Sequence, residues 1–274
     1  MTRDRVGTAA DMSLSLTFIG NATVLLSWGS FTVLTDPSFL HAGQRVHLGY
    51  GLFTARLLDP AMQVEDLPPL DAVVLSHLHG DHWDRVAQRS LDRALPVITT
   101  PHASRRLQGL AGFRRAVGVD TWERHTLVKG QELLTVTALP GRHGPALVAR
   151  LLPPVMGSLL EFGDTTGAVA QRVYLTGDTL MYDRIHEIAR RWPDVDLAVV
   201  HLGGTTLPGG IVVTMDGRQG ADLLDVVRPR RAVPVHVDDY AVMRSPLSDF
   251  TDEMSRRGLS GMVRVVGRGE TATL

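Results

Sequence analysis

The sequence predicts an α/β (α+β) protein in which two mixed β-sheets lie face to face and helices cover their outer surfaces, a four-layer αββα sandwich. Three observations lead to this prediction. Short segments rich in β-branched and aromatic residues open the chain, strand-like and helix-like segments then alternate, and the same order occurs again in the second half. No linker-like stretch or short repeat interrupts this order, so we expect one domain over residues 1–274.

The first half opens with three short strands and continues with strand–helix alternation. The two-residue separator Gly29-Ser30 suits a tight hairpin turn, and Pro37 ends the third strand. Residues 38–69 contain three prolines and are expected to form irregular loop with one short helix. The predicted strands are 14–19, 23–28, 31–36, 72–76 and 96–100, and the predicted helices are 83–95 and 101–110.

The second half repeats this arrangement. A Lys-Gly-Gln turn over 129–131 separates the first two strands, and helical spacing returns after residue 181. The predicted strands are 126–128, 132–139, 146–152, 158–162, 172–176, 196–202, 231–236 and 262–266, and the predicted helices are 182–192, 217–227 and 248–258.

The composition argues against several classes of protein and of metal site. With 28 Lys and Arg against 29 Asp and Glu, the net charge is −1, so no broad basic field is available for nucleic acid or anionic lipid. The chain has no cysteine, and any metal ion must therefore be held by His, Asp or Glu. It has neither a membrane-length apolar stretch nor a signal-peptide pattern. We expect a cytoplasmic protein without nucleic-acid partners or stable membrane insertion; no oligomeric state is predicted.

The stretch Ser-His-Leu-His-Gly-Asp-His-Trp-Asp over 76–84 concentrates polar residues at the end of a predicted buried strand. His77 and His79 are spaced i, i+2, so in an extended strand end both imidazoles point to the same side and can bind one ion. Asp81 and His82 follow Gly80 and are expected to turn away, toward a second ion.

Three further polar residues follow other predicted strands: His143, Asp178 and His236. Taken alone, His143 could be a turn residue and Asp178 a helix-capping residue. Together with the cluster they give seven potential ligands at one edge of the sheets, which indicates a metal site. Imidazole and carboxylate ligands without thiolate suit Zn²⁺ and also admit Mn²⁺ or Fe²⁺.

The H-x-H-x-D-H pattern, followed in order by Gly-Arg-His, Thr-Gly-Asp and Pro-Val-His, resembles the metallo-β-lactamase superfamily. Segments such as Val-Leu-Thr-Asp-Pro and Thr-Gly-Asp-Thr look similar to the branch that includes ascorbate-6-phosphate lactonases and N-acyl-phosphatidylethanolamine-hydrolysing phospholipase D. The resemblance implies the metallo-β-lactamase fold and a binuclear centre of two divalent metal ions, with His77, His79 and His143 on one, Asp81, His82 and His236 on the other, and Asp178 bridging them.

A hydrolase mechanism follows from that resemblance. Two cations lower the pKa of a shared water, and the resulting hydroxide can attack an ester, lactone, amide or phosphoester of a small soluble substrate. Asp81, His201 and Tyr240 are the candidate catalytic residues. His201 could donate a proton to substrate or leaving group, or be a polar rim residue; Tyr240 could face the pocket or lie in a surface loop.

Three other residues are candidates for a supporting or substrate-binding role. Asp36 could orient a ligand histidine, or be only a turn residue ahead of Pro37. Asn21 and Thr214 stand where many members of the phospholipase-like branch carry histidine, so the substrate of those relatives does not transfer to this chain.

Two other functions stay open at this point. One is a phosphodiesterase acting on phospholipid or nucleic acid, for which the apolar segment 151–162 is the candidate lipid contact, although a buried strand pair explains it better. The other is a non-catalytic protein of the same fold that binds a ligand, which would be expected to have lost ligand residues. Here all seven positions are filled.

Overall fold

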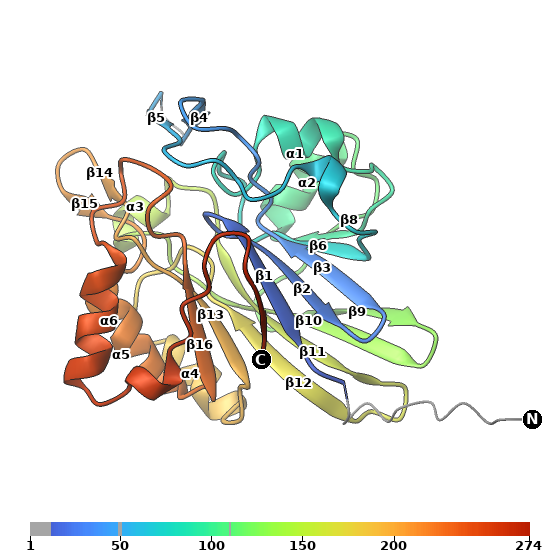
Figure 1. Ribbon diagram of the computed structural model, residues 1–274. Coiled ribbons are helices and arrows are strands. Elements are labelled where there is room, and N and C mark those ends of the chain that lie inside the picture. Colours follow the sequence, from blue (N-terminus) through green and yellow to red (C-terminus); the bar gives the residue numbers. More distant parts are fainter. Residues whose placement is uncertain (1–11, 49–50, 110) are drawn as a thin grey trace, which may run out of the picture.

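Two large β-sheets form the centre of the molecule (Figure 1). The computed structural model describes residues 12–48, 51–109 and 111–274. Most of the N-terminal segment searched for a signal peptide, and Leu110 at the end of one predicted helix, lie outside these residues. The two sheets are mixed and helices cover them, so the predicted α/β class is confirmed.

The first sheet has seven strands in the order β17-β1-β2-β3-β6-β7-β8. Strands β1 to β3 are antiparallel, whereas β3, β6, β7 and β8 run parallel. The strands are β1 (Ser15–Gly20), β2 (Thr23–Trp28), β3 (Phe31–Thr35), β6 (Ala72–Val74), β7 (Val97–Thr99), β8 (Ala116–Gly118) and β17 (Thr271–Thr273).

The predicted last strand over 262–266 is wrong. Residues Ser260–Met262 form a 3-10 helix (η3), and Val263 makes only one bridge, to Ala232 at the edge of the second sheet. The chain then crosses to the edge of the first sheet, where β17 pairs antiparallel with β1. A strand of three residues after a Gly-rich turn leaves little periodic signal, so the sequence did not indicate it.

The second sheet has six strands in the order β16-β13-β12-β11-β10-β9. Strands β9 to β12 form an antiparallel meander, and β12, β13 and β16 run parallel. The strands are β9 (Arg124–Lys129), β10 (Glu132–Pro140), β11 (Met156–Asp164), β12 (Val169–Leu175), β13 (Leu197–His201) and β16 (Arg231–Val235).

The strand predicted over 146–152 is also wrong. Strands β10 and β11 pair directly, with Pro140 opposite Met156, so the residues between them loop out of the sheet. This loop contains the short helix α3 (Ala146–Ala149), and its Leu147 and Leu151 are exposed rather than alternately buried. An apolar run of this length does not distinguish a strand from a helical turn.

Helices cover the outer face of each sheet (Figure 1). The first sheet carries α1 and α2, and the second carries α4, α5 and α6. The predicted helix over 83–95 is shorter than expected. The bounds are α1 (Arg85–Ser90), α2 (Pro101–Gly109), α4 (Ile185–Arg191), α5 (Gly217–Val227) and α6 (Leu247–Arg256). None of the helices in the described ranges has the length and apolarity needed to cross a membrane.

Two small hairpins were not predicted. The segment 38–69 holds the expected short helix as a 3-10 turn, η2 (Val64–Asp66), and in addition a hairpin of β4 (Arg45–His47) and β5 (Phe53–Ala55). A second hairpin, β14 (Thr206–Leu207) with β15 (Ile211–Val212), follows β13. In Figure 1 both hairpins project beyond the sheets.

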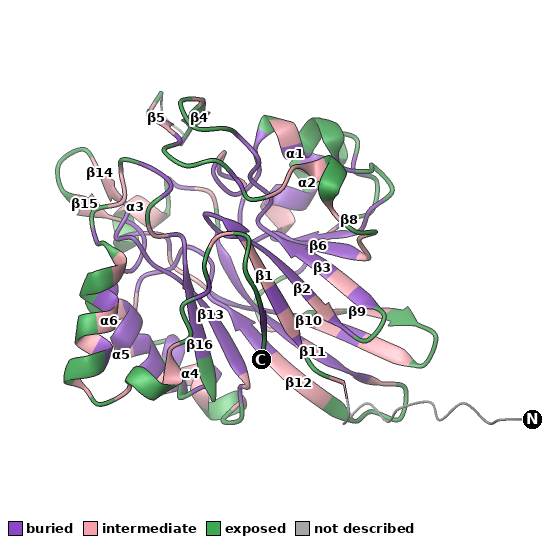
Figure 2. Cartoon of the chain, in the orientation of Figure 1, coloured by how far each residue is buried: buried purple, intermediate pink, exposed green. Residues whose placement is uncertain are grey.

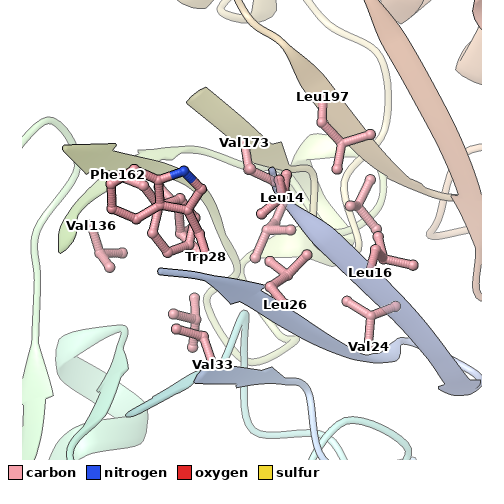
Figure 3. Packing of buried hydrophobic residues seen from close by; sticks show 14 of the residues in the cluster. Leu14, Leu16, Val24, Leu26, Trp28, Val33, Val136, Phe162, Val173 and Leu197 are labelled. Atoms are coloured by element: carbon pink, nitrogen blue, oxygen red, sulfur yellow. The ribbon is translucent and has the colours of Figure 1, made fainter. Parts of the chain in front are cut away.

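The core between the sheets follows the period-two pattern of strands. Leu14, Leu16, Val24 and Leu26 from the first sheet meet side chains of the second, including Phe162 (Figure 3). Side chains at the alternate positions of the strands face the helices instead. Leu25 and Val73 pack under α1 and α2, and Ala198 and Val200 pack under α4 to α6. Burial is therefore concentrated in the sheets and the inner helix faces (Figure 2), which gives the four layers predicted.

This topology brings chemistry-bearing residues together. Strands β3 and β6 run parallel in one sheet, and β12, β13 and β16 run parallel in the other. Carboxyl ends of parallel strands meet at one edge of a sheet. His201, which ends β13, and the residues that follow the other strands, among them Asp36, His77, Asp178 and His236, therefore lie at the carboxyl-end edges of the two sheets.

Candidate metal centre

Three groups of buried side chains in the described residues place potential metal-ligand atoms within 4.8 Å of one another, and the third, Asp36, His82 and His201, shares His82 with the second. The first group is His77, His79 and His143; the second is Asp81, His82, Asp178 and His236. The structure thus brings together all seven residues named from the sequence, with Asp178 in the second group only.

In the first group three imidazoles converge. His77 Nε2 lies 2.9 Å and His143 Nε2 lies 3.2 Å from His79 Nδ1. His143 Nδ1 lies 2.9 Å from the Val213 carbonyl oxygen and donates to it, so its Nε2 carries a lone pair. His77 Nδ1 lies 2.9 Å from the Ser76 hydroxyl, which itself donates to Asp36, so His77 likewise keeps its Nε2 lone pair.

The charge state of the first group favours cation binding. Burial lowers the pKa of all three histidines, that of His79 to about 3, so the rings are neutral at pH 7. Neutral imidazole is the form that binds a metal ion. These neutral nitrogen atoms could therefore hold a divalent cation.

The second group mixes carboxylates and imidazoles. His82 Nε2 lies 3.4 Å from Asp178 Oδ2, and His236 Nε2 lies 3.4 Å from Asp81 Oδ2. His236 donates from Nδ1 to the Leu202 carbonyl oxygen at 3.1 Å. Burial lowers the pKa of His82 and of His236, but the neighbouring carboxylates, Asp178 and Asp81 for both and also Asp36 for His82, together outweigh burial and raise both values. A negative site of this kind attracts protons or a cation.

Asp178 acts on both groups. Its negative charge also acts to raise the pKa of His77, His79 and His143, although burial has the larger effect and all three values stay lowered. An electrostatic influence on every histidine of both groups is expected of a carboxylate that lies between them. Its role as a bridging ligand stays a prediction.

Unpaired atoms test whether these residues fit metal ions. Four buried polar atoms of the two groups have no hydrogen-bond partner: His79 Nε2, Asp81 Oδ1, His82 Nε2 and Asp178 Oδ1. Leaving such an atom unpaired costs about 1–3 kcal/mol, and more when the group is charged. Coordination, or a hydrogen bond to water held beside a bound ion, would remove this cost, and the donor set of nitrogen and carboxylate oxygen suits Zn²⁺, Mn²⁺ or Fe²⁺. The residues present therefore fit divalent cations.

Asp36 holds His82 in place. Its Oδ2 accepts from His82 Nδ1 at 3.0 Å and from the Ser76 hydroxyl at 2.9 Å, and its Oδ1 accepts from the Ser76 backbone N–H at 2.7 Å. Burial raises the pKa of Asp36, but the neighbouring His82 and His201 lower it to about 2. The carboxylate thus fixes the His82 tautomer and directs Nε2 toward Asp178.

His201 lies beside His82. Its ring stacks on that of His82 with the ring centres 6.0 Å apart, and its Nε2 and Nδ1 lie 3.3 Å from Asp36 Oδ2 and 3.2 Å from Thr176 Oγ1. Both nitrogens therefore face protein atoms, and the residue is buried. Proton donation to substrate by His201 stays a prediction, and this geometry favours a role in positioning His82.

Asn21 and Thr214 contact the second group directly. Thr214 Oγ1 donates to Asp178 Oδ2 at 2.9 Å. Asn21 Nδ2 donates to the Asp81 backbone carbonyl oxygen at 2.7 Å, and the Asn21 backbone carbonyl oxygen accepts from the His236 N–H at 2.8 Å. Both side chains are fully buried, so the structure places them as supports of the ligands rather than on an open surface.

Backbone strain is concentrated at the same place. Asn21, Asp36 and His236 have φ values of 53°, 36° and 59°. Such values are uncommon for residues with a side chain, although Asn, Asp and His tolerate them best. Strained backbone that the surrounding structure maintains is typical of functional sites.

Tyr240 is buried away from solvent. Its hydroxyl lies 3.4 Å from Ser38 Oγ, and its ring packs with Leu40 and Val46. Burial raises the pKa of its phenol, so it stays protonated at pH 7. A catalytic role for Tyr240 stays a prediction.

Two cavities border the first group, and Leu78 lines both of them. The smaller, of about 410 Å³, is lined by His79, Gly80 and the β4–β5 hairpin. A Cβ on Gly80 would lie 2.4 Å from Val46 Cγ2 and 2.9 Å from the His47 carbonyl oxygen, so glycine is required for this hairpin to seat against the metal-binding loop. The larger cavity, of about 770 Å³, is lined by His143.

Sequence reasoning missed several residues of this site. Ser76, between Asp36 and His77, was quoted only as the start of the cluster, and Arg142 only as part of the Gly-Arg-His motif. Adjacency to a predicted ligand was the available signal for both. Leu78, which borders both cavities, had no signal beyond its place between two histidines.

Residues 32–237 match the β-lactamase superfamily domain. The chain belongs to this superfamily. The resemblance to the metallo-β-lactamase superfamily seen in the motifs is thereby confirmed.

Three proteins similar to this chain are described as hydrolases. A UPF0173 metal-dependent hydrolase of Deinococcus radiodurans is 29% identical over 263 residues, which cover 95% of this chain and 100% of the relative. N-acyl-phosphatidylethanolamine-hydrolyzing phospholipase D 1 of Caenorhabditis elegans is 24% identical over 242 residues, 84% of this chain and 65% of the relative. A solved structure from Veillonella parvula, described as a possible metal-dependent hydrolase, superposes with a TM-score of 0.80 at 23% identity, covering 96% of this chain and 100% of that one.

Proposed function

We propose that this superfamily member is a metal-dependent hydrolase that cleaves an ester, lactone, amide or phosphoester bond of a small-molecule substrate at a binuclear centre of divalent cations, with Zn²⁺ the first candidate. The observation that carries the proposal is the pair of adjacent buried ligand groups with four unpaired polar atoms. The hydrolase names of relatives that align over most of this chain support the same reaction class.

Bound divalent cations would lower the pKa of a water molecule and polarise the scissile bond. The protein contributes positioning. His77, His79 and His143 present neutral nitrogens toward one point, while Asp36 and Thr214 hold His82 and Asp178 by hydrogen bonds. Asp81 keeps Oδ1 unpaired, so this atom can accept a proton from the attacking water. No amino-acid nucleophile is needed.

Cavity size favours a small substrate. Binding sites for small molecules commonly enclose about 300–1,000 Å³, and both cavities beside the first group fall in this range. We infer a small-molecule partner and no nucleic acid, because the near-zero net charge provides no extended field for a polyanion.

Two observations favour a second candidate, hydrolysis of a phospholipid phosphodiester. Leu147 and Leu151 are 78% and 64% exposed, and Leu151 lines the larger cavity. A relative at 24% identity is named as a phospholipase D. Faster turnover of a phosphodiester substrate in vesicles than in solution would favour this candidate, and equal or slower turnover would favour the small soluble substrate.

The test is metal analysis coupled to a hydrolase panel of esters, lactones, amides and phosphoesters. His79→Ala and Asp178→Ala are expected to lose bound metal and at least about 100-fold in turnover, since each removes a ligand and supporting residues alone account for 10–100-fold. His186→Ala changes an exposed histidine on α4 and serves as the control. Metal content and turnover equal to this control in both variants would refute the proposal.

A further inference from the structure

The larger cavity beside His143 has a strongly cationic lining. Arg106, Arg142, Arg150 and His102 border it, and no aspartate or glutamate is among its described lining residues. Arginine remains protonated in proteins, so at least three positive charges face one space of about 770 Å³.

These arginines come from three separate parts of the chain. Arg106 lies on α2, Arg142 directly precedes the ligand His143, and Arg150 follows α3. The pairing of β10 with β11 loops out the segment that contains α3 and Arg150, and residues of this segment line the same cavity as Arg106 of α2. Their convergence is therefore a property of the fold rather than of one basic segment.

The three arginines differ in burial: Arg142 is half-buried, whereas Arg106 and Arg150 are exposed. Within the described residues, none of them forms an ion pair, whereas Arg56 and Arg257 meet carboxylates at 2.9 Å and 2.7 Å. The Arg142 Nε atom is buried without a hydrogen-bond partner, and its guanidinium lies over the Tyr182 ring, 4.5 Å from the centre. The Nδ1 atom of His102 is likewise buried and unpaired.

Unpaired guanidinium groups in a cavity form a binding site for an anion. Like charges without counter-charges repel, and the planar fork of arginine matches carboxylate and phosphate oxygens. The rest of the wall is largely apolar, with Leu152 and Val155 buried in it. His143 joins this wall to the first ligand group.

We propose that the substrate is an organic anion whose carboxylate or phosphate group is bound by Arg106, Arg142 and Arg150, with its apolar part against Leu152 and Val155 and its scissile bond at the metal centre. This proposal rests on the proposed hydrolase function and adds the substrate class. Arg106 and Arg150 act as specificity-determining residues, since they border the cavity and are not among the metal ligands.

The first test compares three p-nitrophenyl esters of similar size on the metal-loaded protein: the neutral butyrate, the carboxylate-bearing succinate and the phosphonate-bearing 3-phosphonopropanoate. The KM of one or both charged esters is expected to be about tenfold or more below that of the neutral ester, as one charge-assisted hydrogen bond provides. Which charged ester has the lower KM distinguishes carboxylate from phosphate recognition.

Substitutions in the cavity lining test whether its arginines cause the lower KM of the charged ester. The KM advantage of the charged ester is expected to fall about tenfold in Arg106→Gln and in Arg150→Gln, with a smaller change in kcat. Arg105→Gln removes a neighbouring exposed arginine of α2 that does not line the cavity, and is expected to retain the wild-type advantage. No preference for charged esters, or an equal loss in all three variants, would overturn the proposal.

A binding measurement does not depend on turnover. Calorimetric titration of the metal-loaded protein with inorganic phosphate and with succinate should give a Kd at least about fivefold weaker in Arg106→Gln and Arg150→Gln than in Arg105→Gln. An anion held only by the metal ions would bind all three variants equally, which would refute the cationic site. Arginine-dependent binding by a protein without metal or turnover would refute the hydrolase function while supporting the anion site.

Discussion

At the scale of single residues, the candidate metal centre depends on the second nitrogen of its histidines. His82, His143 and His236 each donate from Nδ1 to a fixed acceptor: Asp36 Oδ2, the Val213 carbonyl oxygen and the Leu202 carbonyl oxygen. These bonds choose the tautomer in which Nε2 is free and hold the ring in its orientation.

Asp36 is expected to contribute to metal affinity by orienting His82. Asp36→Asn retains the size of the side chain but removes the charge that orients His82, so divalent metal affinity is expected to fall about 10–100-fold. Asp59→Asn is the matched control, because Asp59 pairs with His41 at 3.1 Å on the surface. Competition with a chelator measures both affinities. Equal affinity in the two variants would show that Asp36 has no part in metal binding.

At the scale of elements, Asp84 connects a helix with a loop. Its Oδ1 accepts from the Val86 and Ala87 N–H groups at the start of α1, at 2.9 Å and 2.8 Å. Its Oδ2 accepts from the N–H groups of Phe39 and Leu40, at 2.5 Å and 2.7 Å. The sequence predicted a helix from residue 83, and Asp84 is the N-cap residue of α1. The hydrogen bonds to the loop after β3 could not be predicted from the sequence, because they join residues that are distant in the chain.

Asp84→Ala is expected to lower the free energy of unfolding by about 2–4 kcal/mol, because a helix cap contributes about 0.5–2 kcal/mol and buried N–H groups lose their acceptor as well. Asp84→Asn retains one acceptor oxygen and should lie in between. Asp216→Ala removes the cap of α5, which accepts one bond, from Gln219, and should cost about 1 kcal/mol. Urea unfolding compares the three; equal losses in Asp84→Ala and Asp216→Ala would contradict the connecting role.

Helices α5 and α6 are joined by an ionic cluster around Arg257. This side chain contacts Asp222 at 2.7 Å and Asp225 at 3.0 Å on α5, and Glu253 at 2.6 Å on α6. Hydrogen bonds from Arg256 and Arg257 lower the pKa of Glu253 from 4.5 to about 2. The carboxylate form is therefore bound preferentially in the folded protein.

A pH dependence follows with a definite sign. Because the folded pKa of Glu253 is the lower one, its contribution to stability is fully present above pH 4.5 and is lost as pH falls toward 2. Glu253→Gln should be less stable than the wild type at pH 6, and the difference should shrink between pH 4.5 and pH 2. Urea unfolding at several pH values measures it. A difference that stays constant over this interval would contradict the assignment.

At the scale of the whole molecule, one buried ion pair joins distant parts of the chain. Arg56, just after β5, meets Asp239, after β16, at 2.9 Å, and both side chains are fully buried. Asp239 also accepts from Arg268 near the C-terminal end and from the Asn21 N–H, at 2.9 Å and 2.7 Å. Through Asn21 this cluster braces the loop of Asp81 and the backbone of His236.

Arg56→Met is expected to lower the free energy of unfolding by about 3–5 kcal/mol, because the Asp239 charge then stays buried with one partner fewer. Arg268→Met is the control: its side chain is 22% exposed, so its loss should cost clearly less. Urea or thermal unfolding compares the two variants. Equal destabilisation would contradict the importance of burial at Arg56.

Much of the fold and of the candidate site could be predicted from local patterns. Strand alternation, the i, i+2 spacing of His77 and His79, and a polar residue after each buried strand are all visible over a few residues. The same apolar pattern failed at 146–152 and 262–266, because pairing between other strands decided whether these segments lay inside a sheet.

The sequence by itself therefore determined the sheet-based fold class and the seven residues that gather at the strand ends, since these depend on short-range periodicity and on the side-chain types that bind cations. Only the tertiary structure decided that Asp36 orients His82, that His201 faces protein atoms on both nitrogens, and that Arg106, Arg142 and Arg150 border one cavity. These contacts join residues that are distant in sequence, and their distances are set by how the sheets and helices pack.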